Sequence, residues 1–358
     1  MKSCITTVLI LISILSYGQS NKDYAKNKKD KAIELMDNGK PDEAIVLLDE
    51  AKKLDPDNYT YDYEKAYAYY IKQDYKTSLK IYIDVVKYDN ATDQCFQMLG
   101  NLYDINGESD KALKAYDKGL KKFPNSGRLY LEKGNVYWNQ KKYGDALPFY
   151  EEGIKADPMF PSNYYRAALI FCGSSEEVWG MIYGEIFINL ERNSKRTAEI
   201  SKLLFHTYKS QIKIKNDTVS VSFSKNNTIN ISDLNDIKNF KLPFGTGSYE
   251  PTLALSIVGI KELNINSLDT IRKDFIDNYY SKEFNSKYPN VLFEYQKKIL
   301  QAGYLDSYNH WILMKGDEDN FVKWQDNNKD KWDGFISWFK DNGLKLDDNN
   351  KFYRGQYK

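Results

Sequence analysis

The 358-residue sequence contains few of the side chains that build metal, redox and nucleophilic sites. It has two histidines, His206 and His310, and three cysteines, Cys4, Cys95 and Cys172. Neither histidine has a second histidine or a cysteine at the spacing of zinc ligands. The sequence contains no Gly-x-Ser-x-Gly elbow, no His-Glu-x-x-His helix and no phosphate-binding loop. We therefore predict no metal site, no cofactor and no catalytic residue, in a protein that is not an enzyme.

An excess of charge of one sign is also missing. The chain has 51 Lys and Arg against 50 Asp and Glu, which gives a formal net charge of +1. Proteins that bind nucleic acids or anionic membranes depend on an excess of positive charge. The balance therefore argues against both classes of partner, and we predict no nucleic-acid partner.

The N-terminal apolar run, from Ile5 to Leu15, is shorter than the roughly 20 residues that a membrane-spanning helix needs. It follows Lys2 and precedes Ser16-Tyr17-Gly18, a small-x-small sequence. This arrangement is typical of a secretory signal, although a buried N-terminal helix is the alternative. We expect removal of residues 1–18 and an exported, periplasmic protein without membrane insertion; a secreted or outer-membrane-associated location is the alternative.

Aromatic residues are abundant, because the chain contains 30 Tyr and the aromatic share reaches 15%. Such a composition argues against disorder for most of the chain. The length favours two structural units over one compact core.

The stretch from Asp93 to Pro158 contains two copies of one unit. The first copy carries Phe96, Leu99, Gly100, Tyr103, Ala112, Tyr116, Gly119 and Pro124. The second carries Tyr130, Lys133, Gly134, Tyr137, Ala146, Tyr150, Gly153 and Pro158, each 34 residues after its counterpart. The small residues at positions eight and twenty predict two helices in close approach, and the prolines end each unit.

This period and these positions resemble the tetratricopeptide repeat (TPR) family, here of an exported bacterial type. When the pattern is extended in both directions along the chain, repeats begin near residues 25, 59, 93, 127 and 161. The last repeat is divergent, and a capping helix follows near 197–208. We expect a mainly all-α fold: a TPR helix-turn-helix solenoid over residues 19–210, then an α-rich C-terminal domain over 211–358. Cys95 and Cys172 fall in repeats two units apart, so we predict free thiols and no disulfide between them.

The C-terminal half resembles no family that we recognise. Val219, Val221 and Phe223 alternate with serines, and Ile229 and Ile231 follow, which predicts a short β-hairpin with its turn at 225–227. The segment 233–256 reads as irregular, with a turn at its glycines. Helical spacing returns at 268–279, 291–300, 310–314 and 332–339.

The resemblance implies that the concave wall of first helices binds a protein or peptide partner, at positions two, five, nine, twelve and thirteen of each repeat. Here these positions hold Tyr63, Tyr67, Tyr70, Gln97, Asn101, Asp104, Arg128, Asn135, Trp138 and Tyr165. Aromatic faces beside amides and a guanidinium suit an extended peptide, although some of these rings could simply pack between helices. The TPR subtype that clamps a terminal carboxylate has Lys and Asn where this chain has Lys29 and Ile33, so we expect no such clamp.

The function predicted is therefore a non-enzymatic protein–protein interaction scaffold. Two alternatives stay open. In one, the C-terminal domain is a small-ligand-binding or enzymatic module with a pocket among His310, Trp311 and Trp332. In the other, the tail from Lys345 to Lys358 fills the groove of its own chain.

Overall fold

The structure is a computed structural model that describes residues 2–215, 218–225 and 241–357, with side chains from Ser20 onward. Its first part is a series of helices in pairs. They are α1 (Lys2–Asp37), α2 (Pro41–Leu54), α3 (Thr60–Ile71), α4 (Tyr75–Val85), α5 (Asp93–Ile105), α6 (Ser109–Lys122), α7 (Gly127–Asn139), α8 (Tyr143–Ala156), α9 (Pro161–Cys172), α10 (Glu177–Leu190) and α11 (Lys195–Gln211).

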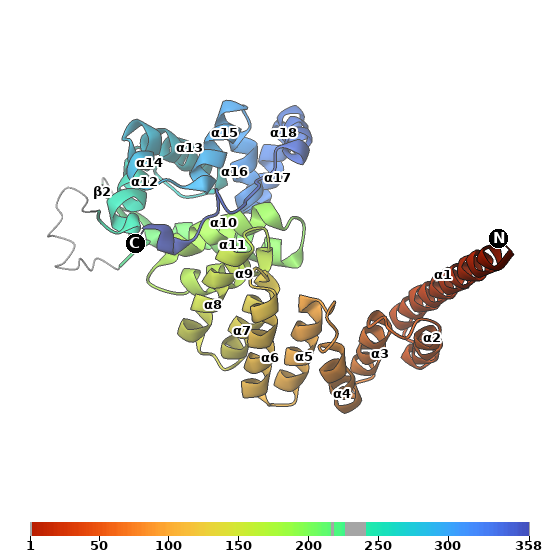
Figure 1. Cartoon of the computed structure of the whole chain (residues 1–358). Helices are drawn as coiled ribbons and strands as arrows, with labels where there is room; N and C mark the ends of the chain where they lie inside the picture. Colours follow the sequence, from red (N-terminus) through yellow and green to blue (C-terminus); the bar gives the residue numbers. More distant parts are fainter. Residues whose placement is uncertain (1, 216–217, 226–240, 358) are drawn as a thin grey trace. The chain divides into compact units, whose positions relative to one another are not determined.

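The second part holds one hairpin and further helices (Figure 1). They are β1 (Ile212–Lys215), β2 (Thr218–Val221), the π-helix η2 (Gly245–Tyr249), α12 (Glu250–Ser256), α13 (Ile265–Ser281), α14 (Phe284–Lys287), α15 (Val291–Gln301), α16 (Leu305–Leu313), η3 (Met314–Gly316), α17 (Glu318–Asn327), α18 (Lys329–Asp341) and η4 (Arg354–Tyr357). The predicted all-α fold with a short hairpin is thus confirmed. Within the described ranges, no helix is both long and apolar enough to span a membrane.

The hairpin lies one strand earlier than the sequence pattern predicted. β2 pairs antiparallel with β1, which precedes it, and Ile214 faces Val219 in the register. The predicted turn at 225–227 extends beyond the described residues after Lys225, and the predicted second strand at Ile229 and Ile231 lies outside them. Ile212 and Ile214 alternate with lysines directly after α11, so the helix end concealed the strand signal.

Residues 245–256, predicted as irregular, form η2 and α12. A Cβ atom on Gly245 would lie within 3.0 Å of the Ser224 side chain, and one on Gly247 within 3.0 Å of the Tyr288 hydroxyl. These glycines therefore permit close packing and do not form a turn. Pro251 is the second residue of α12, which continues directly from η2.

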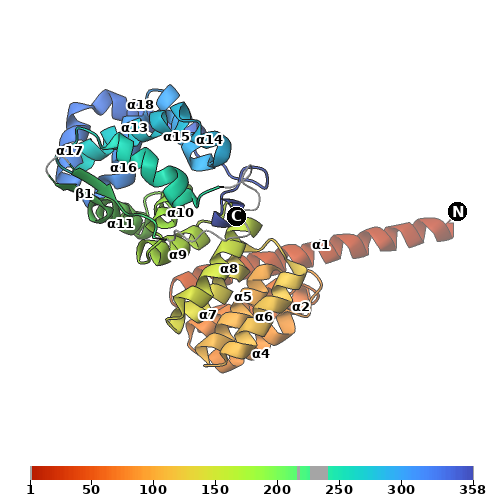
Figure 2. The same cartoon turned by 90° about the vertical axis from the view of Figure 1, so that its left-hand side faces the viewer.

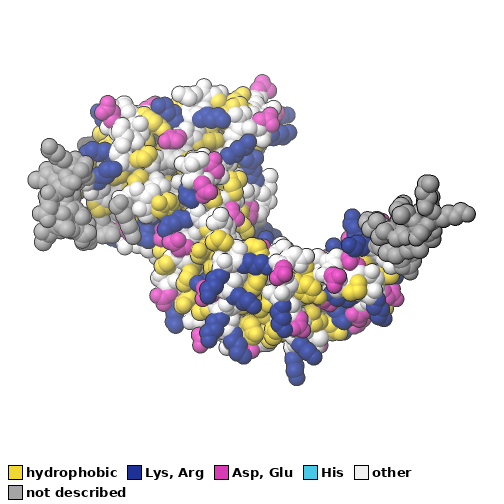
Figure 3. Space-filling model, viewed as in Figure 1, with side chains coloured by type: hydrophobic (Ala, Val, Ile, Leu, Met, Phe, Trp, Pro, Cys, Tyr) yellow, Lys and Arg dark blue, Asp and Glu magenta, His cyan; other side chains and the backbone are white. Residues whose placement is uncertain are grey.

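Contacts between Cα atoms divide the chain within α7 into unit 1 (Met1–Val136) and unit 2 (Tyr137–Lys358). The boundaries predicted from sequence, at 210 and 211, fall inside unit 2 and stay a prediction. Each unit is described here by itself. On the face that Figure 3 shows, basic and acidic side chains are interspersed.

Unit 1 contains three helix pairs, α1 with α2, α3 with α4 and α5 with α6. α5 begins at Asp93, where a repeat is predicted to begin. The small residue at position eight acts as expected: a Cβ atom on Gly100 would lie within 3.0 Å of three atoms of the Tyr116 ring. In the preceding repeat, Ser78 Oγ donates a hydrogen bond of 2.7 Å to the carbonyl of Ala66. Backbones in adjacent helices can therefore approach closely only because these side chains are small.

Unit 2 is built around α10, whose residues are all buried except Leu190. This helix packs against α9 and α11. Its central residue, Glu185, forms an ion pair of 2.7 Å with Arg272 of α13 and accepts hydrogen bonds from Gln296 of α15 and Tyr308 of α16. A helix that is apolar all round must be covered on every side. The C-terminal helices supply the cover on the side away from α9, next to α10 and α11 in Figure 2.

The C-terminal tail is seated on unit 2. Phe352 is fully buried, and the ring of Tyr357 stacks on Phe244 with centroids 4.7 Å apart. Arg354 forms a two-pronged ion pair with Glu151 of α8, with nitrogen–oxygen distances of 3.0 and 2.8 Å. Arg354 thus pairs with α8, which is the second helix of its repeat. The alternative predicted from the sequence placed the tail in a groove formed by first helices.

Candidate functional site

The first-helix residues of α3 form a row of tyrosines in unit 1. Tyr67 stacks on Tyr70 with ring centroids 6.0 Å apart, and Tyr70 contacts Tyr75 at 5.6 Å. Tyr67 is 38% exposed. Tyr63 instead meets Tyr82 edge-to-face at 5.4 Å, and burial raises the pKa of Tyr63 to about 12. Tyr63 therefore packs between helices, which is one of the two interpretations of these tyrosines. Tyr67 presents its ring to solvent, as the other interpretation requires.

A polar network joins α5 and α7 within unit 1. Gln97 donates a hydrogen bond of 2.6 Å to Glu132 and accepts one of 3.2 Å from Arg128. Asn135 donates to the other oxygen of Glu132 at 3.0 Å. Gln97 and Asn135 thus share the carboxylate of Glu132, which the prediction missed, and Arg128 joins the network through Gln97. Both polar atoms of Gln97 already have partners. A bound protein that contacts Gln97 must therefore replace one of these hydrogen bonds.

The missed residue, Glu132, occupies position six of its repeat. It follows Arg128 by four residues and precedes Asn135 by three, so the three side chains share one face of α7. Position six lies one helical turn after position two, so adding that position to the prediction would have included Glu132.

The other two predicted residues of α5 bind the second helix of their own repeat. Asn101 accepts a hydrogen bond of 2.6 Å from the hydroxyl of Tyr116, and Asp104 accepts one of 2.9 Å from Ser109. The Asn101 side-chain amide nitrogen has no acceptor within the described ranges of the chain. It can therefore donate to a bound peptide carbonyl while the carbonyl oxygen stays paired.

In unit 2 the predicted residues Trp138 and Tyr165 flank an arginine that the prediction missed. The guanidinium carbon of Arg166 lies 4.5 Å from the centroid of the Trp138 ring and 5.8 Å from that of Tyr165. The Tyr165 hydroxyl donates a hydrogen bond of 2.7 Å to Glu199. Burial and this hydrogen bond raise the pKa of Tyr165 to about 12. Arg166 is again at position six, in the same place in its repeat as Glu132.

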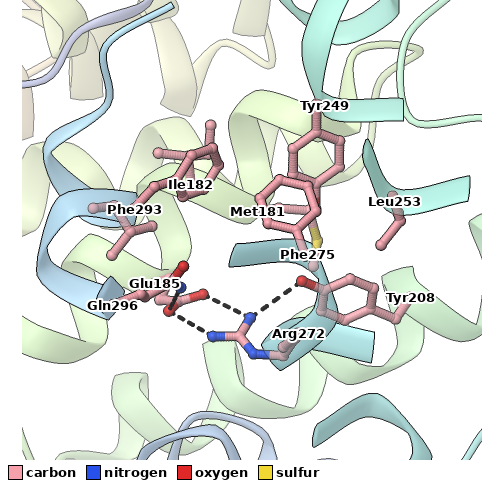
Figure 4. A pocket seen from close by; sticks show the side chains of 11 residues that line it. Met181, Ile182, Glu185, Tyr208, Tyr249, Leu253, Arg272, Phe275, Phe293 and Gln296 are labelled. Atoms are coloured by element: carbon pink, nitrogen blue, oxygen red, sulfur yellow. Dashed lines mark hydrogen bonds and ion pairs between the residues drawn. The ribbon is translucent and has the colours of Figure 1, made fainter. Parts of the chain in front are cut away.

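A small cavity lies inside unit 2, between α10 and the C-terminal helices (Figure 4). Glu185, Arg272 and Gln296 line its polar end, and rings including Tyr249 and Phe275 line the remainder. Its volume of about 20 Å³ is close to the space that one water molecule needs. The cavity is therefore too small for an organic ligand.

The cluster of His310, Trp311 and Trp332 is packed with side chains. His310 stacks on Trp324 with ring centroids 4.0 Å apart, and its Nδ1 lies 2.8 Å from the carbonyl oxygen of Asp306. Burial lowers the pKa of His310 below its ordinary value of 6.5. Trp311 packs on Phe335 and Phe339, and Trp332 on Phe321, Trp324 and Phe335. These contacts fill the place where the alternative interpretation required an enclosed pocket.

The described residues also include side chains that could act as ligands of a metal ion. In the part of the chain that the structure describes, no three His, Cys, Asp or Glu side chains come together as a metal site. Cys95 and Cys172 are both free thiols.

Comparison with known proteins agrees with the helix pairs. A sequence model described as Tetratricopeptide repeat matches residues 29–92 and 98–158. Hsp70-Hsp90 organizing protein 3 of Arabidopsis thaliana is 25% identical over 111 residues, which cover 31% of this chain. The chain spans only about a fifth of that relative's length, because the match covers 20% of it.

Three solved structures are among those to which the chain is similar. PilF of Pseudomonas aeruginosa is 16% identical with a TM-score of 0.45, covering 53% of this chain and 86% of its own. YrrB, titled a TPR protein with an unusual peptide-binding site, is 18% identical with a TM-score of 0.35, covering 53% and 95%. TTC0263 of Thermus thermophilus is 14% identical with a TM-score of 0.41, covering 50% and 98%. Similarity at this level carries no conclusion on function.

The assignment rests on the sequence match and on the helix pairs. The matched residues run from α1 to the end of α8, and α5 and α7 begin 34 residues apart, at Asp93 and Gly127. The chain therefore contains tetratricopeptide repeats over residues 29–92 and 98–158.

Proposed function

We propose that this protein is a non-enzymatic scaffold that binds an extended peptide segment of a protein partner on the exposed faces of its first helices. In unit 1 this face includes Tyr67, Tyr70 and the amide of Asn101. In unit 2 it includes Trp138 and Tyr165. Aromatic rings supply contact area at low entropic cost, and side-chain amides pair with the backbone of a bound strand.

The observation that carries this proposal is the stacked pair of Tyr67 and Tyr70. Tyr67 is 38% exposed, so part of its apolar ring is in water. Its stack on Tyr70 restricts the side chain, and binding therefore costs little further side-chain entropy. Aromatic side chains that become buried when a partner binds often dominate the energetics of interfaces. The packed cluster around His310 offers no comparable surface, so we propose no second function for the C-terminal helices.

We also propose that the protein is exported. Support comes from Lys2, the apolar run from Ile5 to Leu15 and the small residues that follow it.

Binding tests the scaffold proposal directly. Peptides are selected from a displayed random library on the full chain, and their affinities are measured by fluorescence anisotropy. We expect Tyr67→Ala to weaken binding by about tenfold or more, since truncation of an aromatic anchor removes its buried area. Asn101→Ala should weaken the same peptides by about threefold to tenfold, because it removes a hydrogen bond of typical strength.

The matched control is Ile83→Ala on the second helix α4, where the side chain is 37% exposed. It removes a similarly exposed apolar side chain and should leave affinity unchanged. If Ile83→Ala weakened the selected peptides as much as Tyr67→Ala does, or if no peptide were selected at all, the proposal would be wrong.

A further inference from the structure

Arg166 of α9 lies against two aromatic rings. Its guanidinium carbon lies 4.5 Å from the Trp138 centroid and 5.8 Å from that of Tyr165. Trp138 is itself fixed edge-on by Tyr143 at 4.9 Å, and Tyr165 is fixed by its hydrogen bond to Glu199. The position of the guanidinium is therefore set by its surroundings before any ligand binds.

In the described part of the chain, the charge of Arg166 has no counter-ion. Among the residues that the structure describes, no carboxylate lies within ion-pair distance of it and no acceptor takes its N–H groups. The neighbouring Arg196 differs, because Glu191 holds it by two hydrogen bonds and Ser162 by a third. Of the two guanidinium groups beside Tyr165, only Arg166 keeps its donors available.

The chemistry of this site favours a carboxylate. A guanidinium presents its N–H groups in a planar fork that matches the two oxygens of a carboxylate. The two cation–π contacts use the π faces of the rings and none of the N–H donors of Arg166, which stay available to an anion. The rings also lower the cost of holding the side chain in place, because the cation–π contacts persist when an anion binds at the edge.

We propose that Arg166 binds an acidic side chain, Asp or Glu, within the peptide segment of the protein partner. This inference rests on the proposed function and specifies the chemistry of its ligand. We assign a side-chain carboxylate in preference to a terminal one, since a clamp for a chain end uses several donors and only one guanidinium is available here. The partner segment is therefore acidic at the residue that contacts α9.

The test uses the same displayed library, selected in parallel on the wild-type chain and on Arg166→Gln. Wild type should enrich peptides with an Asp or Glu at one fixed position, and Arg166→Gln should lose that enrichment. For one selected peptide, Arg166→Gln and replacement of the acid by its amide should each weaken binding by about fivefold to twentyfold. The two changes together should cost no more than either alone, because both remove the same contact.

Arg192→Gln is the matched control. Arg192 also lies over an aromatic ring, with its guanidinium carbon 4.0 Å from the Phe339 centroid, so its loss removes the same charge from unit 2 at another place. It should leave both enrichment and affinity unchanged. Equal losses in Arg192→Gln and Arg166→Gln would overturn the assignment, because general electrostatics would then explain them.

Two further outcomes separate this inference from the proposed function. Peptides that bind through Tyr67 but show no acidic position would overturn the role of Arg166 and leave the scaffold proposal standing. Peptides that bind only with a free C-terminus, and are lost on C-terminal amidation, would overturn the choice of a side-chain carboxylate. Failure to select any peptide would overturn both proposals.

Discussion

Arg272→Met is expected to lower the free energy of unfolding of unit 2 by about 3–5 kcal/mol, the usual cost of removing one partner from a buried ion pair. Arg272 and Glu185 are 6% and 5% exposed, and two nitrogen–oxygen contacts of 2.9 and 2.7 Å join them. The substitution leaves the buried Glu185 without its counter-ion. Proximity to Glu185 also holds the pKa of Arg272 above its ordinary value despite burial, so the arginine stays charged throughout. Urea unfolding followed by circular dichroism measures the change.

Lys273→Met is the control for this substitution. Lys273 is the next residue of α13 and pairs with Asp269 at 2.7 Å, but its side chain is 36% exposed. Exposed ion pairs contribute little, so the loss should stay below about 1 kcal/mol. A double variant, Arg272→Met with Glu185→Leu, should recover part of the loss because no charge is then left buried. If Arg272→Met cost no more than Lys273→Met, the network around α10 would not hold unit 2 together.

Gly100→Ala is expected to destabilise unit 1 by about 2 kcal/mol, although alanine favours helices by up to about 1 kcal/mol over glycine. The new methyl group would lie within 3.0 Å of three atoms of the Tyr116 ring. That ring is 1% exposed, and its hydroxyl donates to Asn101, so it cannot move aside without loss of packing and of a hydrogen bond. Thermal unfolding followed by circular dichroism measures the effect.

Gly144→Ala separates this steric effect from helix propensity. Gly144 lies in the first turn of α8, and a methyl group there would meet no atom within 4 Å. The substitution should leave stability unchanged or raise it by up to about 1 kcal/mol. A similar response of both variants would show that Gly100 is not required for close approach of α5 and α6.

The repeats could be predicted from the sequence because their physics is local. Gly100 and Tyr116 are 16 residues apart, and both belong to one helix pair whose period recurs along the chain. The residues that organise unit 2 could not be predicted in this way. Glu185 binds Arg272, Gln296 and Tyr308, which lie 87, 111 and 123 residues further along the chain. No periodicity connects residues so far apart.

The candidate site was predicted in part for the same reason. The positions taken from the family resemblance include Trp138 and Tyr165, but they omit position six, where Glu132 and Arg166 lie. The spacing places Glu132 on the same helix face as Asn135, and the hydrogen bonds with Gln97 and Asn135 show that it belongs to the network. The significance of Arg166 depends on the absence of a counter-ion in the described part of the chain, which a sequence pattern cannot reveal.

Hydrogen–deuterium exchange of the full chain with and without a selected peptide is the most direct test of the central claim, that the first helices form the binding surface. Bound peptide should slow exchange in the first helices α3, α5, α7 and α9, while the second helices α4 and α6 and the C-terminal helices α13 to α18 stay unchanged. The claim would be contradicted if the slower exchange were confined to α13 to α18, because the partner would then bind the C-terminal helices and the repeats would serve another purpose.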